Sequence, residues 1–165
     1  MSSLQIKILV LFLLFALNKA QAGSIDDGFK ALEQFNYFEA KKQFEKSLKS
    51  NESAANYGLA LIYYRKDNPF HQLDSAHVKI VRSEKAYSLT KEKQKVYLKK
   101  YNFDYLAIEK LRQEISTALF QVVQKNPSEE AYNQFQKNND WSTERFKAIY
   151  SRDSIGYQKA KDINT

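Results

Sequence analysis

The 165-residue chain contains no cysteine, only two histidines, two prolines and four glycines. Without cysteine it has neither a disulfide nor a thiol nucleophile, so its folded core alone must hold it together. The scarcity of glycine and proline disfavours a β-rich protein, because tight turns between strands depend on both residues. It also leaves no glycine-rich loop that could cradle a phosphate or a dinucleotide. Lys, Glu, Gln, Leu and Ala are abundant, and this composition favours helices.

The supply of groups for catalysis or metal binding is equally small. His71 and His77 are six residues apart, a spacing that fits neither a helical metal pair nor a zinc motif. Asp26 and Asp27 are adjacent, and we interpret them as acidic residues in the first turn of a helix, where the helix dipole favours negative charge. We therefore expect no enzyme activity, no cofactor and no metal site.

The first residues have the pattern of a secretory signal peptide. Lys7 is followed by the apolar run ILVLFLLFAL, and Ala20 and Ala22 form a small-x-small cleavage site before Gly23. The run is shorter than the roughly 20 apolar residues that span a bilayer, although an uncleaved anchor is the alternative. We expect residues 1–22 to be removed and the mature chain to carry no transmembrane span. Such a chain is exported, to the periplasm of a Gram-negative envelope or beyond it.

The chain is mildly basic, with acidic and basic residues interspersed along most of its length. Removal of the signal peptide lowers the formal net charge from +7 to +5. Interspersed charges are typical of a solvated helical surface, and export also speaks against nucleic acid as a partner. The densest basic stretch covers residues 91–100. We interpret it as a solvated connection, with a patch for acidic lipid headgroups or another anionic envelope component as the alternative.

A pattern of small and large residues repeats in the first half of the chain. Ala40, Phe44 and Ser47 are spaced four and three residues apart, and the spacing recurs 36 residues later. A glycine lies upstream of each copy, and the second copy contains about six extra residues around the turn signal Asn68-Pro69. The second set of small and large residues is Ala76, Ile80 and Ser83, and the two glycines are Gly28 and Gly58.

These residues give the segment from about Ser24 to Tyr87 a resemblance to two tetratricopeptide repeats. That family pairs two antiparallel helices in about 34 residues, with a glycine in the first and small and aromatic residues in the second. This chain departs from the family pattern in three ways: it lacks the opening Trp, it has Ser for the second Ala, and no Pro closes either unit. The matching positions are Gly28, Tyr37, Ala40, Phe44 and Ser47 in the first unit and, more loosely, Gly58, Tyr63, Ala76, Ile80 and Ser83 in the second.

The resemblance implies a concave groove, lined by the first helix of each pair, that binds a peptide or a protein segment. Alternatively, the same residues pack against later helices of the chain. The residues that would face the groove are Phe29, Leu32 and Glu33 in the first unit and Leu59, Ile62 and Tyr63 in the second.

The remainder of the chain also has helical periodicity. A long apolar stripe predicts a helix over 104–124, Ser128 is a candidate cap for the next, and a third should begin near Ser142. Residues 90–102 read as a polar connection or a weakly amphipathic helix. We expect residues 23–88 to form the tetratricopeptide-like hairpins, and 89–165 a further repeat-like region that is cut short at its C-terminal end.

The end of the chain can be aligned with an earlier segment at a shift of 37 residues, which places Phe120 on Tyr157 and Val123 on Ala160. Chance is the alternative explanation for so loose a match. If the match is genuine, the last helix exposes an apolar face that needs further repeats, a partner or a second copy to cover it. The apolar residues of that helix are Phe146, Ile149, Tyr150, Ile155, Tyr157 and Ala160.

Together these patterns predict an all-α protein whose antiparallel helix pairs stack as a tetratricopeptide-like α-solenoid. We expect an exported, non-enzymatic scaffold that binds a protein or peptide and has a tendency to self-associate. The alternative is the N-terminal structural or assembly segment of a larger cell-envelope protein, whose functional domain lies beyond residue 165.

Overall fold

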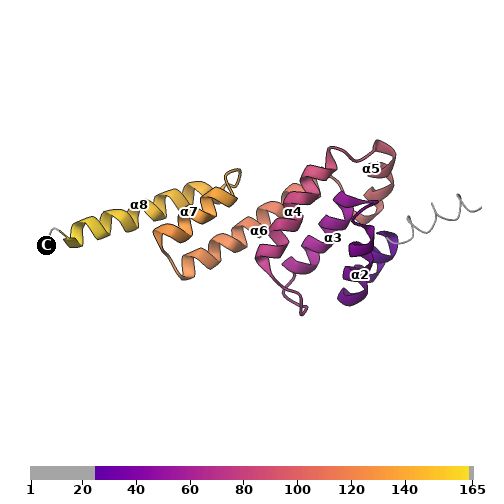
Figure 1. Ribbon diagram of the computed structural model, residues 1–165, viewed down its shortest axis with the longest axis horizontal. Helices are drawn as coiled ribbons and strands as arrows, with labels where there is room; N and C mark the ends of the chain where they lie inside the picture. The colour runs from indigo at the N-terminus through magenta and orange to yellow at the C-terminus, as the bar shows by residue number, and fades with distance from the viewer. Residues whose placement is uncertain (1–24, 164–165) are drawn as a thin grey trace, which may run out of the picture.

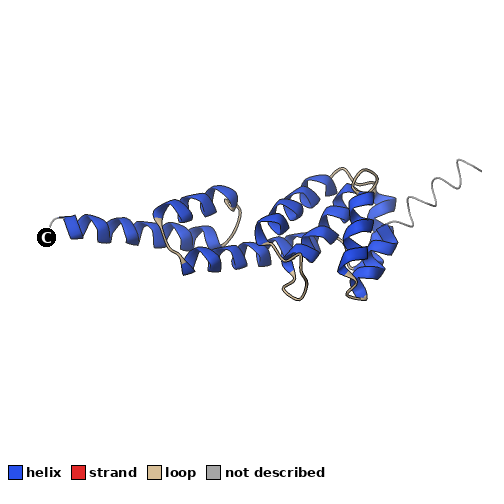
Figure 2. Cartoon of the chain, turned by 60° about the horizontal axis from the view of Figure 1, so that its bottom comes forward, coloured by secondary structure: helices blue, strands red, loops and turns tan. Residues whose placement is uncertain are grey.

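The computed structural model describes residues 25–163, and every regular element in that part of the chain is helical (Figures 1 and 2). The predicted all-α class is therefore confirmed for these residues, whereas the predicted signal peptide, 1–22, lies outside them. A first helix covers residues 25–33. The later elements are α2 Tyr37–Ser47, α3 Glu52–Tyr64, α4 Leu73–Tyr87, α5 Glu92–Leu98, the 3-10 helix η1 Lys99–Tyr101, α6 Tyr105–Lys125, α7 Glu129–Asn138 and α8 Glu144–Ile163.

Along the long axis of the molecule, the first helix, α2, α3 and α5 lie at one end, α4 and α6 follow, and α8 forms the other end (Figure 1). Helix α3 packs between α2 and α4, α4 packs on α6, and α7 packs on both α6 and α8. Apart from α5 and η1, which contact the first helix, each helix therefore packs mainly on the helix before it and the helix after it. This arrangement is compatible with a helical-repeat fold.

Polar side chains begin the helices where the sequence predicts them. The Asp104 carboxylate accepts a hydrogen bond of 2.8 Å from the backbone N–H of Ala107 at the start of α6. Ser128 accepts one of 3.0 Å from the N–H of Ala131 at the start of α7. These are N-caps, which satisfy amide groups that have no partner inside the helix. The predicted starts of both helices are confirmed.

The two connections that the sequence marks as irregular have different structures. The extra residues of the second unit form the loop between α3 and α4, where the Asn68 side chain donates to the carbonyls of Ile62 and Arg65 at 2.9 and 2.8 Å. The stretch 90–102 contains α5 and η1. It ends at Asn102, whose φ of 53° lies in the left-handed region that asparagine tolerates better than most residues.

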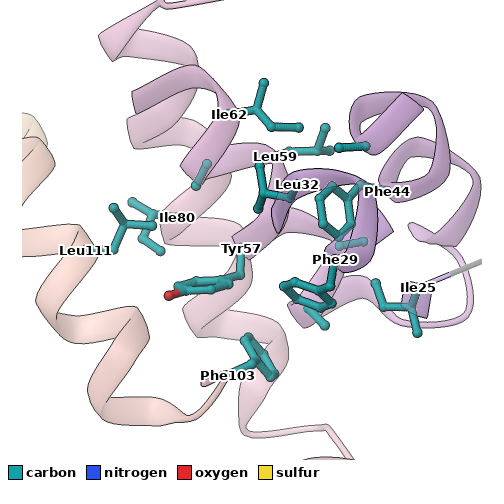
Figure 3. Close-up of a cluster of buried hydrophobic side chains, with 14 of the residues drawn as sticks. Ile25, Phe29, Leu32, Phe44, Tyr57, Leu59, Ile62, Ile80, Phe103 and Leu111 are labelled. Atoms are coloured by element: carbon teal, nitrogen blue, oxygen red, sulfur yellow. The ribbon is translucent and has the colours of Figure 1, made fainter. Parts of the chain in front are cut away.

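The first hydrophobic cluster is organised around the fully buried ring of Phe44 (Figure 3). This ring lies between the glycines of the first helix and of α3. A Cβ atom on Gly28 would come within 2.8 Å of the ring, and one on Gly58 would come closer still. Phe29 meets the same ring edge-on, with 5.0 Å between the centroids. Glycine is required at both positions because the ring occupies the space of a side chain.

A reciprocal pair of buried serines joins α3 to α4. The Ser53 hydroxyl donates to the Ser83 carbonyl at 2.7 Å, and the Ser83 hydroxyl donates to the Ser53 carbonyl at 2.9 Å. Small side chains let the two backbones approach closely, and the bonds satisfy polar groups that water cannot reach. Serine at the second small position of the repeat thus has a structural role here. The remaining small and large positions, Tyr37, Ala40, Ser47, Ala76 and Ile80, are also buried.

The buried apolar residues of the described chain form two clusters that divide inside α6. Ile108, Leu111 and Ile115 belong to the first cluster, which begins at Ile25. Phe120, one helical turn further on, belongs to the second. Helix α6 is therefore shared, because its first half completes the larger core and its last turns begin the smaller one. The clustered buried apolar residues between positions 89 and 115 therefore belong to the first cluster and not to the second.

Candidate docking surface

Four of the six residues that the sequence assigns to a groove are core residues in this structure. Two are in the first helix and two in α3, and a side chain this deeply buried cannot contact a peptide laid on the surface. Of the six, Glu33 is exposed and Tyr63 is partly buried against the first cluster. The four core residues are Phe29 and Leu32, each 4% exposed, and Leu59 and Ile62, each 0% exposed.

The largest exposed aromatic residues of α8 lie on one face of that helix. Phe146, Tyr150 and Tyr157 are 73%, 79% and 75% exposed. Spacings of four and seven residues place all three within a narrow sector of the helix, since each residue advances about 100°. We call these three residues the aromatic face of α8. The sequence pattern groups Ile155 with them as an apolar residue of the last helix. In the structure, Ile155 lies on the opposite side of α8 and packs against the second cluster.

Ala148 and Tyr157 show the two sides of α8 most clearly. They are nine residues apart, which is half a revolution after two and a half turns. Ala148 is fully buried in the second cluster, whereas Tyr157 is three-quarters exposed. The helix thus turns its small residue towards the preceding helices and its aromatic residues away from them. The exposure of three large aromatic side chains on a packed helix is unusual, because large apolar side chains are normally buried.

Helix α6 contains the same pair of positions, 37 residues earlier, and there both are covered. Leu111 packs back into the first cluster, while Phe120, nine residues later, faces forward onto α7. The ring centroid of Phe120 is 5.4 Å from that of Phe135 and 6.3 Å from that of Tyr132. Phe120 is consequently 4% exposed. The position of Tyr157 is therefore one at which this chain elsewhere places a covering helix.

A polar joint holds the second cluster against the first. The Arg112 guanidinium donates to the Glu84 carboxylate at 2.6 Å, which links α6 to α4. The same guanidinium lies 3.7 Å from the ring centroid of Trp141, in the connection between α7 and α8. This cation–π contact is stabilising, and it adds to the ion pair. The Ser116 hydroxyl donates to the Ser142 hydroxyl at 2.7 Å and ties the start of α8 to α6.

His77 of α4 lies beside this joint. Burial lowers the pKa of His77 below its usual value, and the positive charge of Arg112 lowers it further. A hydrogen bond with the Asn138 backbone and the charge of Asp74 oppose these effects. The structure therefore favours the neutral form of this histidine where the two clusters meet.

Within residues 25–163, no group of three or more acidic or histidine side chains is arranged to hold a metal ion. In the same part of the chain, no helix is long and apolar enough to cross a membrane. Comparison with known proteins finds no family model, no curated protein and no solved structure that matches this chain.

Proposed function

We propose that this chain is an exported, non-enzymatic scaffold of the tetratricopeptide-like kind, which binds a protein partner through the aromatic face of α8. The observation that carries the proposal is the exposure of Phe146, Tyr150 and Tyr157 along one side of a packed helix. Clustered apolar side chains on a surface mark interaction sites, and aromatic residues contribute much of the binding energy at such sites.

The way in which α7 covers α6 supports a particular kind of partner. Tyr132 and Phe135 of α7, three residues apart, place their rings on Phe120. A partner with apolar side chains at the same spacing on an amphipathic helix would cover Tyr157 in the same way. We therefore propose a helical segment of another protein as the occupant. We propose this surface in place of the concave groove, because four of the six side chains assigned to the groove are buried in the core.

The same observation supports the alternative in which the covering helix belongs to a longer form of this protein. In that longer form, the shift of 37 residues would align the counterpart of α7 with the residues after Thr165. The coding sequence downstream of this residue discriminates the two proposals. A third occupant is a second copy of the chain, which sedimentation detects as a dimer.

A photo-crosslinking amino acid in place of Tyr150 or Tyr157 tests the proposed partner in the native host. We expect both positions to crosslink to one protein, through a peptide with apolar residues three or four apart. Leu106 is the matched control, since it is 71% exposed on α6 and lies outside the aromatic face. Equal crosslinking from Leu106, or none from either tyrosine, would contradict the proposal.

A second measurement tests the energetic role of the tyrosines. Both are exposed, so Tyr150→Ser with Tyr157→Ser should leave the helical circular dichroism unchanged. With each tyrosine contributing at least about 1 kcal/mol at a hot spot, the double variant should lose tenfold or more in affinity for the captured partner.

For the proposed export, mass spectrometry of protein from the native host should find Gly23 at the N-terminus. Retention of Met1 on most molecules would overturn that part.

A further inference from the structure

The end of the molecule opposite α8 has a hollow with a basic rim. A cavity of about 350 Å³ opens between the first helix, the connection from α2 to α3, and α5. Its walls include the apolar Ile25, the amide of Asn51, the phenol of Tyr97 and the side chains of Lys91 and Lys93. A smaller hollow of about 170 Å³ shares Asn51 with the first. Together they offer positive charge beside apolar surface.

Large apolar side chains are exposed around these hollows. Leu89, in the connection from α4 to α5, is 84% exposed and lines the smaller one. Tyr97, which lines the larger one, is 44% exposed, and its neighbour Val96 on α5, which lines neither, is 65% exposed. Leucine, valine and tyrosine beside lysine are typical of surfaces that enter the interface of a bilayer, where tyrosine rings and lysine stems are both accommodated.

The charges of this region are unevenly balanced. Residues 91–100 contain five lysines and one acidic residue, Glu92. Lys95 pairs with Glu92 at 2.6 Å, and Lys100 pairs with Asp26 at 3.3 Å. Lys91, Lys93 and Lys99 are exposed and have no acidic side chain of residues 25–163 within ion-pair distance. Of the residues that line the two hollows, only Glu52 is acidic, and it lines the smaller one.

A hydrogen-bonded network fixes this basic end to the first helix. The Asp26 carboxylate accepts hydrogen bonds from the phenols of Tyr97 and, at 2.7 Å, Tyr101. The ring of Tyr101 stacks on Phe29, with 4.6 Å between the centroids. Burial and the Asp26 hydrogen bond raise the pKa of Tyr101 to about 12, so the phenol stays protonated and continues to donate. The lysines of α5 are thus presented by a fixed scaffold.

The basic end of the molecule follows the N-terminal apolar run closely in the sequence, which favours a membrane as its partner. Ile25 lines the larger cavity, and only seven residues separate it from the apolar run that ends at Leu17. Seven residues span at most about 25 Å, so this end stays near a membrane while the run is inserted in it. Cleavage before Gly23 would instead leave a new ammonium group two residues from Ile25, which adds to the positive charge.

We propose that this end of the molecule is a membrane-contact surface that binds anionic phospholipid headgroups. Lys91 and Lys93 would contact the phosphates at the rim of the larger cavity. Leu89 and Val96 would enter the interfacial layer beside them. Basic residues near an anionic bilayer contribute about fivefold in affinity each, and a few apolar side chains add to this.

A fluorescent label that senses polarity tests the contact directly on the full chain. Because the chain has no cysteine, Leu89→Cys provides a unique attachment site. We expect its emission to shift to the blue with vesicles of phosphatidylcholine and phosphatidylglycerol, but not with phosphatidylcholine alone. The control label at Val122→Cys, on α6 and 50% exposed, should respond to neither vesicle. This design separates contact of the basic end from any attachment through the apolar run, which tethers both labelled chains equally.

Charge variants complete the test. In the double variant Lys91→Gln with Lys93→Gln, the lipid concentration that gives half of the emission shift should rise about 25-fold. Two contributions of about fivefold each imply this value. Lys110→Gln with Lys137→Gln, two exposed lysines of α6 and α7, should change it less than about twofold. The proposal is overturned if Leu89→Cys does not respond to anionic vesicles, if Val122→Cys responds equally, or if the Lys91 and Lys93 variant behaves as wild type. A response to heparin with none to vesicles would also overturn it.

Discussion

The ring of Phe44 on α2 lies so close to Gly58 on α3 that a Cβ atom at position 58 would overlap it. Phe44 is fully buried, and Gly28 lies against the same ring from the first helix. A large residue of one helix thus fills the space that two glycines leave on its neighbours. This relationship explains why Gly28 and Gly58 accompany Phe44 in the sequence pattern.

Gly58→Ala should destabilise the protein by about 1–3 kcal/mol, because the added methyl group overpacks a ring that cannot move away. The higher helix propensity of alanine offsets only part of this cost. Urea unfolding monitored by circular dichroism measures the change.

Gly156→Ala is the matched control for this prediction. Gly156 also lies inside a helix, but a Cβ atom there would meet nothing within 4 Å. This variant should be more stable by up to about 1 kcal/mol, from helix propensity alone. The two changes in the free energy of unfolding need not be equal in size. If both variants were stabilised, or both destabilised, the result would contradict the packing of Phe44 on Gly58.

Ser53→Ala and Ser83→Ala should each cost about 0.5–1.5 kcal/mol, the usual net contribution of a buried hydrogen bond. Each hydroxyl donates to the backbone carbonyl of the other residue, so neither bond needs the other side chain. The double variant should therefore show additive costs, to within about 0.5 kcal/mol. Strong coupling in the double-mutant cycle would indicate that the contact between the two hydroxyls, at 3.5 Å, matters more than the bonds to the carbonyls.

Stability should decrease as the pH falls below about 6.5, the pKa of histidine in an unfolded chain. The folded structure lowers the pKa of His77, so between the folded and unfolded pKa values the unfolded chain binds the extra proton. This contribution to stability is complete above pH 6.5 and is lost as the pH falls towards the folded pKa. His77→Gln should reduce the dependence of the urea midpoint on pH across this window. His71→Gln, at an exposed histidine, is the control, and identical pH profiles for the two variants would refute the role of His77.

The second cluster should open at a lower free energy than the first. Of the described residues, four are buried in it and twenty in the first cluster. Fewer buried apolar side chains give less protection against local unfolding. Hydrogen exchange should therefore be faster in α7 than in α3.

Phe135→Ala provides the variant for this experiment, because it removes a large side chain from the smaller cluster, where such changes cost about 3–5 kcal/mol. We expect α7 and α8 to lose protection while α3 and α4 keep theirs. A parallel loss in α3 would mean that the whole molecule unfolds as one cooperative unit.

The residues that carry the repeat pattern could be predicted because local sequence and packing agree there. Glycine, alanine and serine at helical spacing mark the close approaches, and Asp104 and Ser128 mark helix starts through their own side chains. The groove residues could not be placed in this way. Phe29 and Leu59 have the same apolar character whether they face a ligand or another helix, and only the position of α5, η1 and α6 decides between the two.

Which face of α8 is buried was likewise beyond the sequence. Composition places Phe146, Tyr150, Tyr157 and Ile155 on one apolar helix, and their spacing separates Ile155 from the aromatic residues. Spacing does not say which of the two sides meets α7. Only the packing shows it, because Ala148 is fully buried in the second cluster whereas Tyr157 is 75% exposed.

The sequence by itself thus determined the helical class, the ends of the long helices and the small and large residues that join the first three. These properties depend on side chains within a few turns of one another, so the local pattern contains them. Only the tertiary structure decided which apolar residues are covered, where the two clusters divide, and which lysines come together with Ile25 and Asn51 at the basic end. These properties depend on contacts between residues far apart in the chain, and the pattern along a single helix does not specify its neighbour.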